Sequence, residues 1–248
     1  MSFETPRYYP IDEFEYPSVT TIINATIPKF WLAPWSRKMT AMCMRDTIIF
    51  EMGKAQATMA TKEFIECIDI DQIVKEAEDY PDKIKDEAGD RGKRLHEAIH
   101  AYVKGDTVKA DDDIAEPFKR FIEWYEINRI KVLFIEEKVW HDPIGYAGRV
   151  DWINKIRLLY GKKDKLYITD FKISPRIYYE HQVQVAAYAF AAEYTFGDRM
   201  DGAMIIGLGD EKELKYKELN RKQLKELFHQ FKLMTQLYYA RFNWEGKR

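Results

Sequence analysis

The stretch YITDFKIS, residues 167–174, alternates apolar and polar side chains in the way that a β-strand requires. Within it, Asp170 and Lys172 stand two positions apart, so a strand would place both side chains on one face, about 6.6 Å apart. An acid and a base held in this way can form a solvent-exposed ion pair. They can also be a metal ligand beside a catalytic amine, and the rest of the chain has to decide between the two interpretations.

The segments around this stretch predict a sheet flanked by helices. Strands are expected over 131–141, 146–156, 165–174, 202–208 and 215–219, and helices over 18–24, 33–68, 80–105, 114–129, 178–196 and 221–244. Ser18 or Thr20 is the expected N-cap of the first helix, and Gly105 the expected end of the third. This order of elements predicts an α/β fold with a mixed central β-sheet flanked by helices, plus an N-terminal helical lobe.

The composition limits the class of protein. A chain of 248 residues suits one large domain or a core with an appended lobe, and a hydrophobic content of 46% indicates a globular protein. No apolar run approaches the about 18 residues of a membrane helix, and the N-terminus lacks the pattern of a secretion signal. Cys43 and Cys67 are the only cysteines, which excludes a disulfide framework and a four-cysteine iron–sulfur cluster. We therefore expect a cytoplasmic protein with no membrane partner.

The net charge of −2 does not by itself indicate a nucleic-acid partner, because domains that bind nucleic acids are often strongly basic. The charge is unevenly distributed, however, since residues 63–90 are rich in acids and residues 212–248 are rich in lysine and arginine. A local groove can therefore differ in charge from the chain average. We interpret the basic C-terminal helix as a solvated face rather than a track for DNA.

Acidic residues stand at comparable ends of three consecutive predicted strands. Glu136 or Glu137 lies on the first, Asp151 on the second, and Asp170 with Lys172 on the third. Because adjacent strands lie about 4.8 Å apart, Asp151 and Asp170 could share one ion. Mg²⁺ takes oxygen ligands and keeps several waters, which suits a site that admits a phosphate oxygen. An isolated Asp-x-Lys is more often a solvated charge pair, so the ordered set is what favours a catalytic site.

Four short motifs follow one another along the chain: G-x-x-x-H at Gly92–His96, G-x-x-D at Gly148–Asp151, D-x-K at Asp170–Lys172 and Q-x-x-x-Y at Gln184–Tyr188. In this order and spacing they resemble the RecB-type branch of the PD-(D/E)xK nuclease superfamily. The opening YPSVTTIINATIPKFWLAPW, residues 16–35, is also similar to the starts of phage exonucleases and mitochondrial genome maintenance exonucleases.

This resemblance implies a restriction-endonuclease-like core. Residues 1–248 would form a single nuclease domain, with a helical N-terminal lobe at 1–85 and the core with its C-terminal helix at 86–248. The implied activity is that of a phage or bacterial DNA exonuclease that depends on Mg²⁺ or Mn²⁺ and has no iron–sulfur cluster. Its partners would be single-stranded DNA or DNA ends, together with recombination or replication proteins.

The resemblance also implies roles for single residues. The metal would be held by the side chains of His96, Asp151 and Asp170 and by the carbonyl of Phe171. The catalytic residues would be Lys172, Asp170, Asp151 and Glu137, with Glu136 as the rival of Glu137 because the strand register is open. The expected substrate contacts are Gln184, Tyr188, Arg149, Arg94 and Trp35.

Two alternatives remain open. The stretch HEAIH, residues 96–100, is also the H-E-x-x-H signature of zinc proteases, in which two histidines on one helix face bind zinc. That signature does not identify a third ligand, and it leaves Asp151, Asp170 and Lys172 unexplained. The other alternative is a non-catalytic DNA-binding module on the same fold, against which the intact set of two aspartates and a lysine argues. Members of the nuclease branch often carry an acid where this chain has His100.

Overall fold

The computed structural model describes residues 6–30, 32–58, 69–128, 130–156, 164–174, 176–209 and 214–242. Residues 59–68 of the helix expected over 33–68, with Cys67, lie outside these ranges. The chain divides into two compact units, of which one comprises Met1–Phe3 and Lys29–Asp90 and the other Glu4–Pro28 and Arg91–Arg248.

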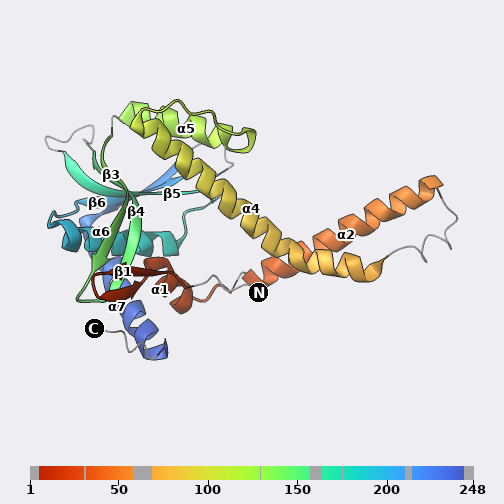
Figure 1. The fold of residues 1–248 in the computed structure, drawn as a ribbon, viewed down its shortest axis with the longest axis horizontal. Helices are drawn as coiled ribbons and strands as arrows, with labels where there is room; N and C mark the ends of the chain where they lie inside the picture. Colours follow the sequence, from red (N-terminus) through yellow and green to blue (C-terminus); the bar gives the residue numbers. More distant parts are fainter. Residues whose placement is uncertain are drawn as a thin grey trace. The chain divides into compact units, whose positions relative to one another are not determined.

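The second unit is built on a five-stranded sheet with helices on both of its faces (Figure 1). Its strands are β3 (Lys131–His141), β4 (Tyr146–Ile156), β5 (Lys165–Lys172), β6 (Gly202–Gly207) and β7 (Lys215–Asn220). Its helices are α1 (Val19–Thr26), α5 (Asp112–Asn128), α6 (Tyr179–Phe196), α7 (Arg221–Phe242) and the last part of α4 (Ile70–Lys104). These elements confirm the expected α/β fold with flanking helices.

The sheet has the order β3-β4-β5-β6-β7 and mixes both strand directions. Strands β5 and β6 are parallel, and the other neighbouring pairs are antiparallel. A parallel pair needs a long crossover connection, which α6 supplies between β5 and β6. The expected meander of β3, β4 and β5 and the mixed character of the sheet are both confirmed.

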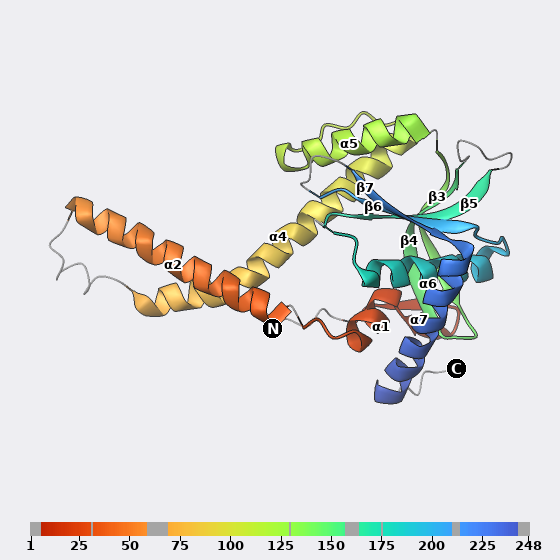
Figure 2. The same ribbon diagram turned by 180° about the vertical axis from the view of Figure 1, so that it is seen from behind.

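The central strands β4, β5 and β6 are buried on both faces of the sheet, which explains why they are apolar at most positions. On β4, Ile153 belongs to the core under α1, α6 and α7, whereas Trp152 and Ile156 belong to the core under α4 and α5. Figure 2 shows these two sets of helices on opposite sides of the sheet. Successive side chains of a strand point to opposite faces, so a strand covered on both sides must be apolar at nearly every position.

The N-terminal segment is part of this unit. Strands β1 (Tyr8–Ile11) and β2 (Phe14–Pro17) form a hairpin, and Ser18 forms a bridge with Ala147 of β4. The backbone N–H of Thr21 donates to Ser18 Oγ at 2.9 Å, which confirms Ser18 as the N-cap of α1. Because α1 buries its apolar side chains against α6 and α7, it groups with the sheet rather than with the helical lobe expected over 1–85.

The other unit contains α2 (Leu32–Thr58) and the first part of α4. On α2, Trp35 is half-buried, and several large apolar side chains are exposed, namely Ile48, Ile49, Phe50 and Met52.

Helix α4 ends just before Gly105, whose positive φ of 93° is the left-handed conformation that commonly terminates a helix. No helix within the described ranges combines the length and the apolar character that crossing a membrane would require.

Candidate active site

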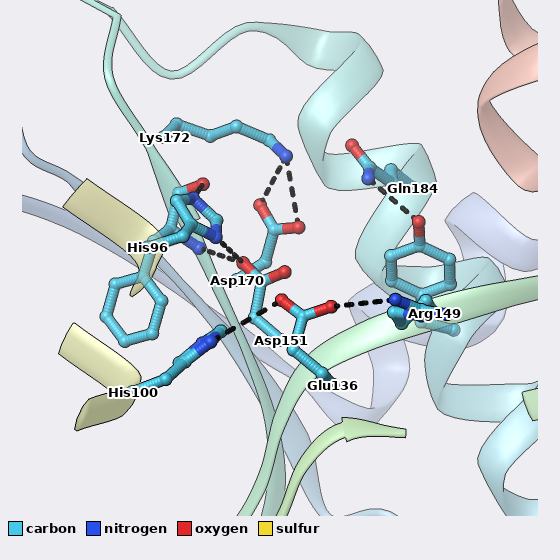
Figure 3. Close-up of polar contacts among 10 residues, drawn as sticks. His96, His100, Glu136, Arg149, Asp151, Asp170, Lys172 and Gln184 are labelled. Carbon is cyan, nitrogen blue, oxygen red and sulfur yellow. Dashed lines mark hydrogen bonds and ion pairs between the residues drawn. The ribbon is translucent and has the colours of Figure 1, made fainter. Parts of the chain in front are cut away.

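Two acidic side chains lie side by side on neighbouring strands, Asp151 on β4 and Asp170 on β5 (Figure 3). Trp152 pairs with Thr169, so Asp151 and Asp170 are the next opposing residues of the antiparallel ladder. The Asp170 side chain is 2% exposed, and burial together with the negative charge of Asp170 raises the pKa of Asp151 to about 6. Two adjacent buried acids favour the presence of a positive charge at this site.

Lys172 supplies one such charge. Its Nζ lies 3.0 Å from Oδ1 and 2.8 Å from Oδ2 of Asp170, and its side chain is 22% exposed. Burial by itself lowers the pKa of Lys172, but the charges of Asp170 and Asp151 outweigh this effect and raise it. The two residues of the D-x-K motif therefore pair a buried carboxylate with a partly buried, charged ammonium and do not form a solvated surface pair. We call Asp151, Asp170 and Lys172 the carboxylate–lysine group.

His96 on α4 connects this group to the helix. Its Nε2 lies 3.1 Å from the carbonyl oxygen of Phe171, and its Nδ1 lies 3.7 Å from Oδ2 of Asp151. The same Oδ2 accepts a hydrogen bond of 2.8 Å from the backbone N–H of Phe171. A carbonyl only accepts, so Nε2 must carry a proton in this arrangement, and the Nδ1 of a neutral ring then turns a lone pair toward a carboxylate. A cation near these oxygens and nitrogens would remove that conflict.

The distances between the polar atoms of these residues test whether the site fits a divalent metal. Ligand atoms around one Mg²⁺ ion lie about 3 Å apart, because each is about 2.1 Å from the ion. The 3.1 Å between His96 Nε2 and the carbonyl oxygen of Phe171 has this value, whereas the 3.7 Å to Asp151 is measured from Nδ1, and one ion can bind only one of the two ring nitrogens. Asp170 contributes a buried carboxylate that faces Lys172. The donor set of imidazole, carboxylates and carbonyl therefore fits a divalent cation in its chemistry.

A second cluster lies beside the first and was only partly anticipated. His100 Nδ1 lies 3.7 Å from Glu136 Oε1, and Arg149 Nη1 lies 3.8 Å from Glu136 Oε2 (Figure 3). Among the described residues, His96, His100 and Glu136 each offer one ligand atom within 4.8 Å of the others. We call these three residues the histidine–glutamate group. Asp151 and Asp170 are not members of it, so the compact ligand cluster differs from the one that the motifs imply.

Burial dominates the chemistry of His100, which is 8% exposed. Burial, followed by the nearby charges of His96 and Lys104, lowers the pKa of His100 to about 4. The ring is therefore neutral at pH 7, which is the form that binds metals. The i, i+4 spacing of the two histidines in HEAIH is the sequence signal that could have identified this cluster.

The structure places Glu136, not the expected Glu137, in this cluster. Glu136 adopts a positive φ of 55°, and the ladder between β3 and β4 is irregular between Val132 and Phe134. Glu137 pairs in register with Val150 and makes no side-chain hydrogen bond or ion pair with any residue that the structure describes. An inserted residue and a left-handed backbone cannot be seen in an alternating sequence, which is why the register remained open.

The G-x-x-D and Q-x-x-x-Y motifs meet in the fold. Gln184 Nε2 donates to the hydroxyl of Tyr188 at 3.1 Å, and both side chains are buried. A Cβ atom on Gly148 would lie 2.4 Å from Cε1 of Tyr188, so only glycine fits beneath this ring. Burial, together with the charges of Asp170 and Asp151, raises the pKa of Tyr188. The contacts of Gln184 and Tyr188 thus support the sheet next to the two acids.

The expected substrate-contacting cations have different surroundings. Arg94 forms ion pairs of 2.7 Å with Asp111 and 2.6 Å with Asp113, so its guanidinium is already bound by two carboxylates of the protein. Arg149 follows Gly148 on β4, and its side chain is 47% exposed.

Trp35 belongs to the other compact unit, so its expected contact with substrate stays a prediction.

Comparisons with known proteins give weak likenesses. No protein-family model and no curated protein matches the chain. Among solved structures, it is similar to a protein from Eubacterium rectale described as a candidate exonuclease, with 14% identity, a TM-score of 0.35, and coverage of 63% of this chain and 68% of that one. It is also similar to SSO0001, with 13% identity, a TM-score of 0.27, and coverage of 59% and 71%. TM-scores of this size do not assign the chain to a family.

Proposed function

We propose that this protein is a metal-dependent deoxyribonuclease that hydrolyses phosphodiester bonds. The observation that carries the proposal is the buried carboxylate–lysine group, in which two acids from adjacent strands hold an ammonium beside His96. Its residues follow the order of the PD-(D/E)xK motifs, on a mixed sheet of the kind that those motifs imply. A solvated charge pair would not require the burial of Asp170 and the partial burial of Lys172.

The residues that would hold the metal are His96, Asp151 and Asp170, together with the carbonyl of Phe171. A bound Mg²⁺ or Mn²⁺ ion supplies Lewis-acid chemistry and neutralises charge at a phosphate. The amide of Phe171 fixes one oxygen of Asp151, which orients that carboxylate before any ligand binds. With the pKa of Asp151 near 6, this carboxylate is largely ionised at neutral pH, as a metal ligand must be.

Lys172 would act through its positive charge. Because the two aspartates raise its pKa, the amine is protonated at neutral pH and is not a general base in this state. An ammonium at this position would contact a non-bridging phosphate oxygen and stabilise the negative charge that develops during in-line attack. Asp170 would orient the amine through the contacts at 2.8 and 3.0 Å.

The finer assignment is also part of the proposal. The motif resemblance favours an exonuclease that acts on single-stranded DNA or DNA ends in replication, recombination or repair. The exposed Arg149 next to Asp151 would bind a backbone phosphate, and Trp35 would stack on an unpaired base. Arg94 would need to exchange its two aspartate partners for a phosphate, so it is the weakest of the expected contacts.

The zinc-protease alternative gains one feature from the geometry. Glu136 lies close to both histidines of HEAIH and could be the third ligand that this signature lacked. Glu97, which would have to be the general base, is exposed and makes no side-chain hydrogen bond or ion pair with the described residues. The carboxylate–lysine group also has no role in that reaction, so nuclease activity is the better explanation.

The deciding experiment is digestion of end-labelled DNA by the purified full-length chain. Single-stranded and double-stranded substrates, with free or blocked ends, would be incubated with Mg²⁺, with Mn²⁺ or with a chelator. We expect cleavage that needs a divalent metal and a free end, and restoration of activity when metal is added back after chelation. Cleavage of circular DNA would replace the exonuclease by an endonuclease, whereas hydrolysis of a peptide with Zn²⁺ alone would support the protease.

A further inference from the structure

The histidine–glutamate group has a geometry that the proposed nuclease reaction does not use. Two of its members lie one turn apart on α4, and the third comes from β3. Their ligand atoms lie within 4.8 Å of one another, and the His100–Glu136 pair is at 3.7 Å. Neighbouring ligands around a tetrahedral zinc ion are about 3.4 Å apart, because each ligand is about 2.1 Å from the ion. Only small side-chain movements separate this cluster from such a geometry.

Two members of this group, His100 and Glu136, lack strong partners among the described residues. The ring of His100 makes no hydrogen bond with them, and its buried Nε2 has no partner. The two contacts of the Glu136 carboxylate, at 3.7 Å to His100 and 3.8 Å to Arg149, are too long to be hydrogen bonds. A buried ring nitrogen without a hydrogen-bond partner is costly, so the position of His100 beside a carboxylate supports a ligand-binding role for the group.

The backbone gives independent support. Glu136 has a φ of 55° within a β-strand, and a left-handed conformation of a residue with a side chain costs on the order of 1 kcal/mol or more. Its side chain lies toward His100 and Arg149 (Figure 3). With 36% exposure of the Glu136 side chain and 24% of the His96 side chain, the cluster is accessible from solvent. Backbone strain of this kind is concentrated at functional sites.

We propose that His96, His100 and Glu136 bind one transition-metal ion of the Zn²⁺ type, at a site distinct from the one formed by Asp151 and Asp170. Two imidazoles and one carboxylate suit zinc, cobalt and nickel, whereas Mg²⁺ prefers sites in which oxygen ligands predominate. The exposed Arg149 guanidinium, 3.8 Å from Glu136, would move toward solvent when the ion binds.

The two sites share His96, which has a regulatory consequence that rests on the proposed nuclease function. His96 also faces Asp151 and Phe171, and a ring held by an ion between His100 and Glu136 cannot keep both of these contacts. Zn²⁺ at the histidine–glutamate group would therefore inhibit cleavage that Mg²⁺ supports. Magnesium activates and zinc inhibits in this scheme, through different ligands.

Binding is tested first, without reference to activity. The metal-free full-length chain is titrated with Co²⁺, whose visible absorption reports tetrahedral coordination, and Zn²⁺ is then used to displace it. We expect His100→Gln and Glu136→Gln each to weaken Co²⁺ binding by at least about tenfold. The matched controls are Glu137→Gln on the same strand and His229→Gln on the exposed face of α7, and both should bind Co²⁺ as the parent protein does.

Asp170→Asn separates the two sites, because it should leave Co²⁺ affinity within about threefold of the parent value. The proposal is overturned if His100→Gln and Glu136→Gln bind Co²⁺ normally, or if Asp170→Asn alone abolishes binding. His100 is buried, so circular dichroism of each variant checks its folding, and the half-exposed Glu136 provides a test that does not depend on a core residue.

Inhibition is tested second, on the rate of Mg²⁺-dependent DNA cleavage. Each rate is expressed relative to the same variant without zinc, and Glu136→Gln should need at least about tenfold more Zn²⁺ for half inhibition. Equal sensitivity of parent and variant would overturn the regulatory part. If no divalent metal supports cleavage while His100→Gln still loses Co²⁺ binding, the nuclease assignment fails and the metal site stands.

Discussion

The carboxylate–lysine group and the histidine–glutamate group lie next to each other, but different physical features hold them together. In the first, Asp170 and Lys172 contact each other at 2.8 Å on one strand, and each charge has an opposite charge beside it. In the second, the closest pair is 3.7 Å apart, one ring makes no hydrogen bond with the described residues, and one backbone is left-handed. We infer that the ammonium of Lys172 holds the first group together before any metal binds, whereas the second group has no such charge within hydrogen-bond distance.

The largest expected effect is on catalysis by the carboxylate–lysine group. Lys172→Ala should lower the rate of DNA cleavage by about a thousandfold or more, because it removes the positive charge that would stabilise the transition state. Gel assays of labelled DNA measure the rate, and fluorescence anisotropy should show DNA affinity within about threefold of the parent value.

Lys165→Ala is the matched control, since Lys165 is an exposed lysine on the same strand. The catalytic role of the carboxylate–lysine group would be contradicted if Lys172→Ala cleaved DNA at the parental rate, or if Lys165→Ala lost as much activity.

The next effect is on stability, and it compares alanine substitutions at two motif glycines, Gly148 and Gly92. A Cβ at Gly148 would lie 2.4 Å from the Tyr188 ring, whereas a Cβ at Gly92 on α4 meets nothing within 4 Å. Gly148→Ala should therefore lower the free energy of unfolding by about 2–3 kcal/mol, and Gly92→Ala should raise it by up to about 1 kcal/mol. Urea denaturation of both variants measures the difference, and equal effects at the two positions would contradict the predicted clash.

The third effect concerns the charge of Asp151 in the metal-free protein. Its folded pKa is raised to about 6, so the stability that its protonated form contributes is full at low pH and is lost as the pH rises through about 6. Asp151→Asn should therefore be more stable than the parent by on the order of 2 kcal/mol at pH 7.5, with little difference near pH 4. Urea denaturation with a chelator present measures this.

The exposed Asp198→Asn is the control for the loss of one carboxylate from the surface. A stability gain of Asp151→Asn that did not change between pH 4 and pH 7.5 would show that the gain has another source than the charge.

The smallest effect tests the strain in the histidine–glutamate group. At a φ of 55°, glycine fits better than glutamate, so Glu136→Gly should keep or raise the free energy of unfolding. The neighbouring Glu137 lacks a positive φ, and Glu137→Gly should lower stability by about 0.5–1 kcal/mol. Thermal denaturation of the two variants should differ in direction, and equal losses would indicate that the backbone at Glu136 is not strained.

The sequence predicted the carboxylate–lysine group well because its signal is local. Asp170 and Lys172 are two residues apart on one strand, and the apolar residues around them fix which face they share. Asp151 follows at the matching end of the preceding strand, so only the strand pairing had to be assumed. The succession of strands, the helix α6 that forms the crossover and a cap at Ser18 or Thr20 were predictable for the same reason.

The histidine–glutamate group was harder to predict because Glu136 lies 36 or more residues from the two histidines and on an element of a different type. Helical spacing indicated that His96 and His100 share a face, but nothing local indicated which glutamate they meet. The irregular pairing of β3 exchanged Glu137 for Glu136, and such an irregularity shifts every later side chain to the other face. The division at Asp90 and Arg91, instead of near residue 85, also depends on contacts made far along the chain.

By itself, the sequence determined the α/β class, the succession of strands and helices, and the identity of the acids, the lysine and the histidine that we assign to chemistry. Those features follow from periodicity and from spacings of a few residues. Tertiary structure alone decided that Asp170 is buried and Lys172 partly buried, that Tyr188 requires Gly148 to be glycine, and that Glu136 joins two histidines. Each of these depends on side chains that meet across the fold, and burial then sets their charge states through the loss of water.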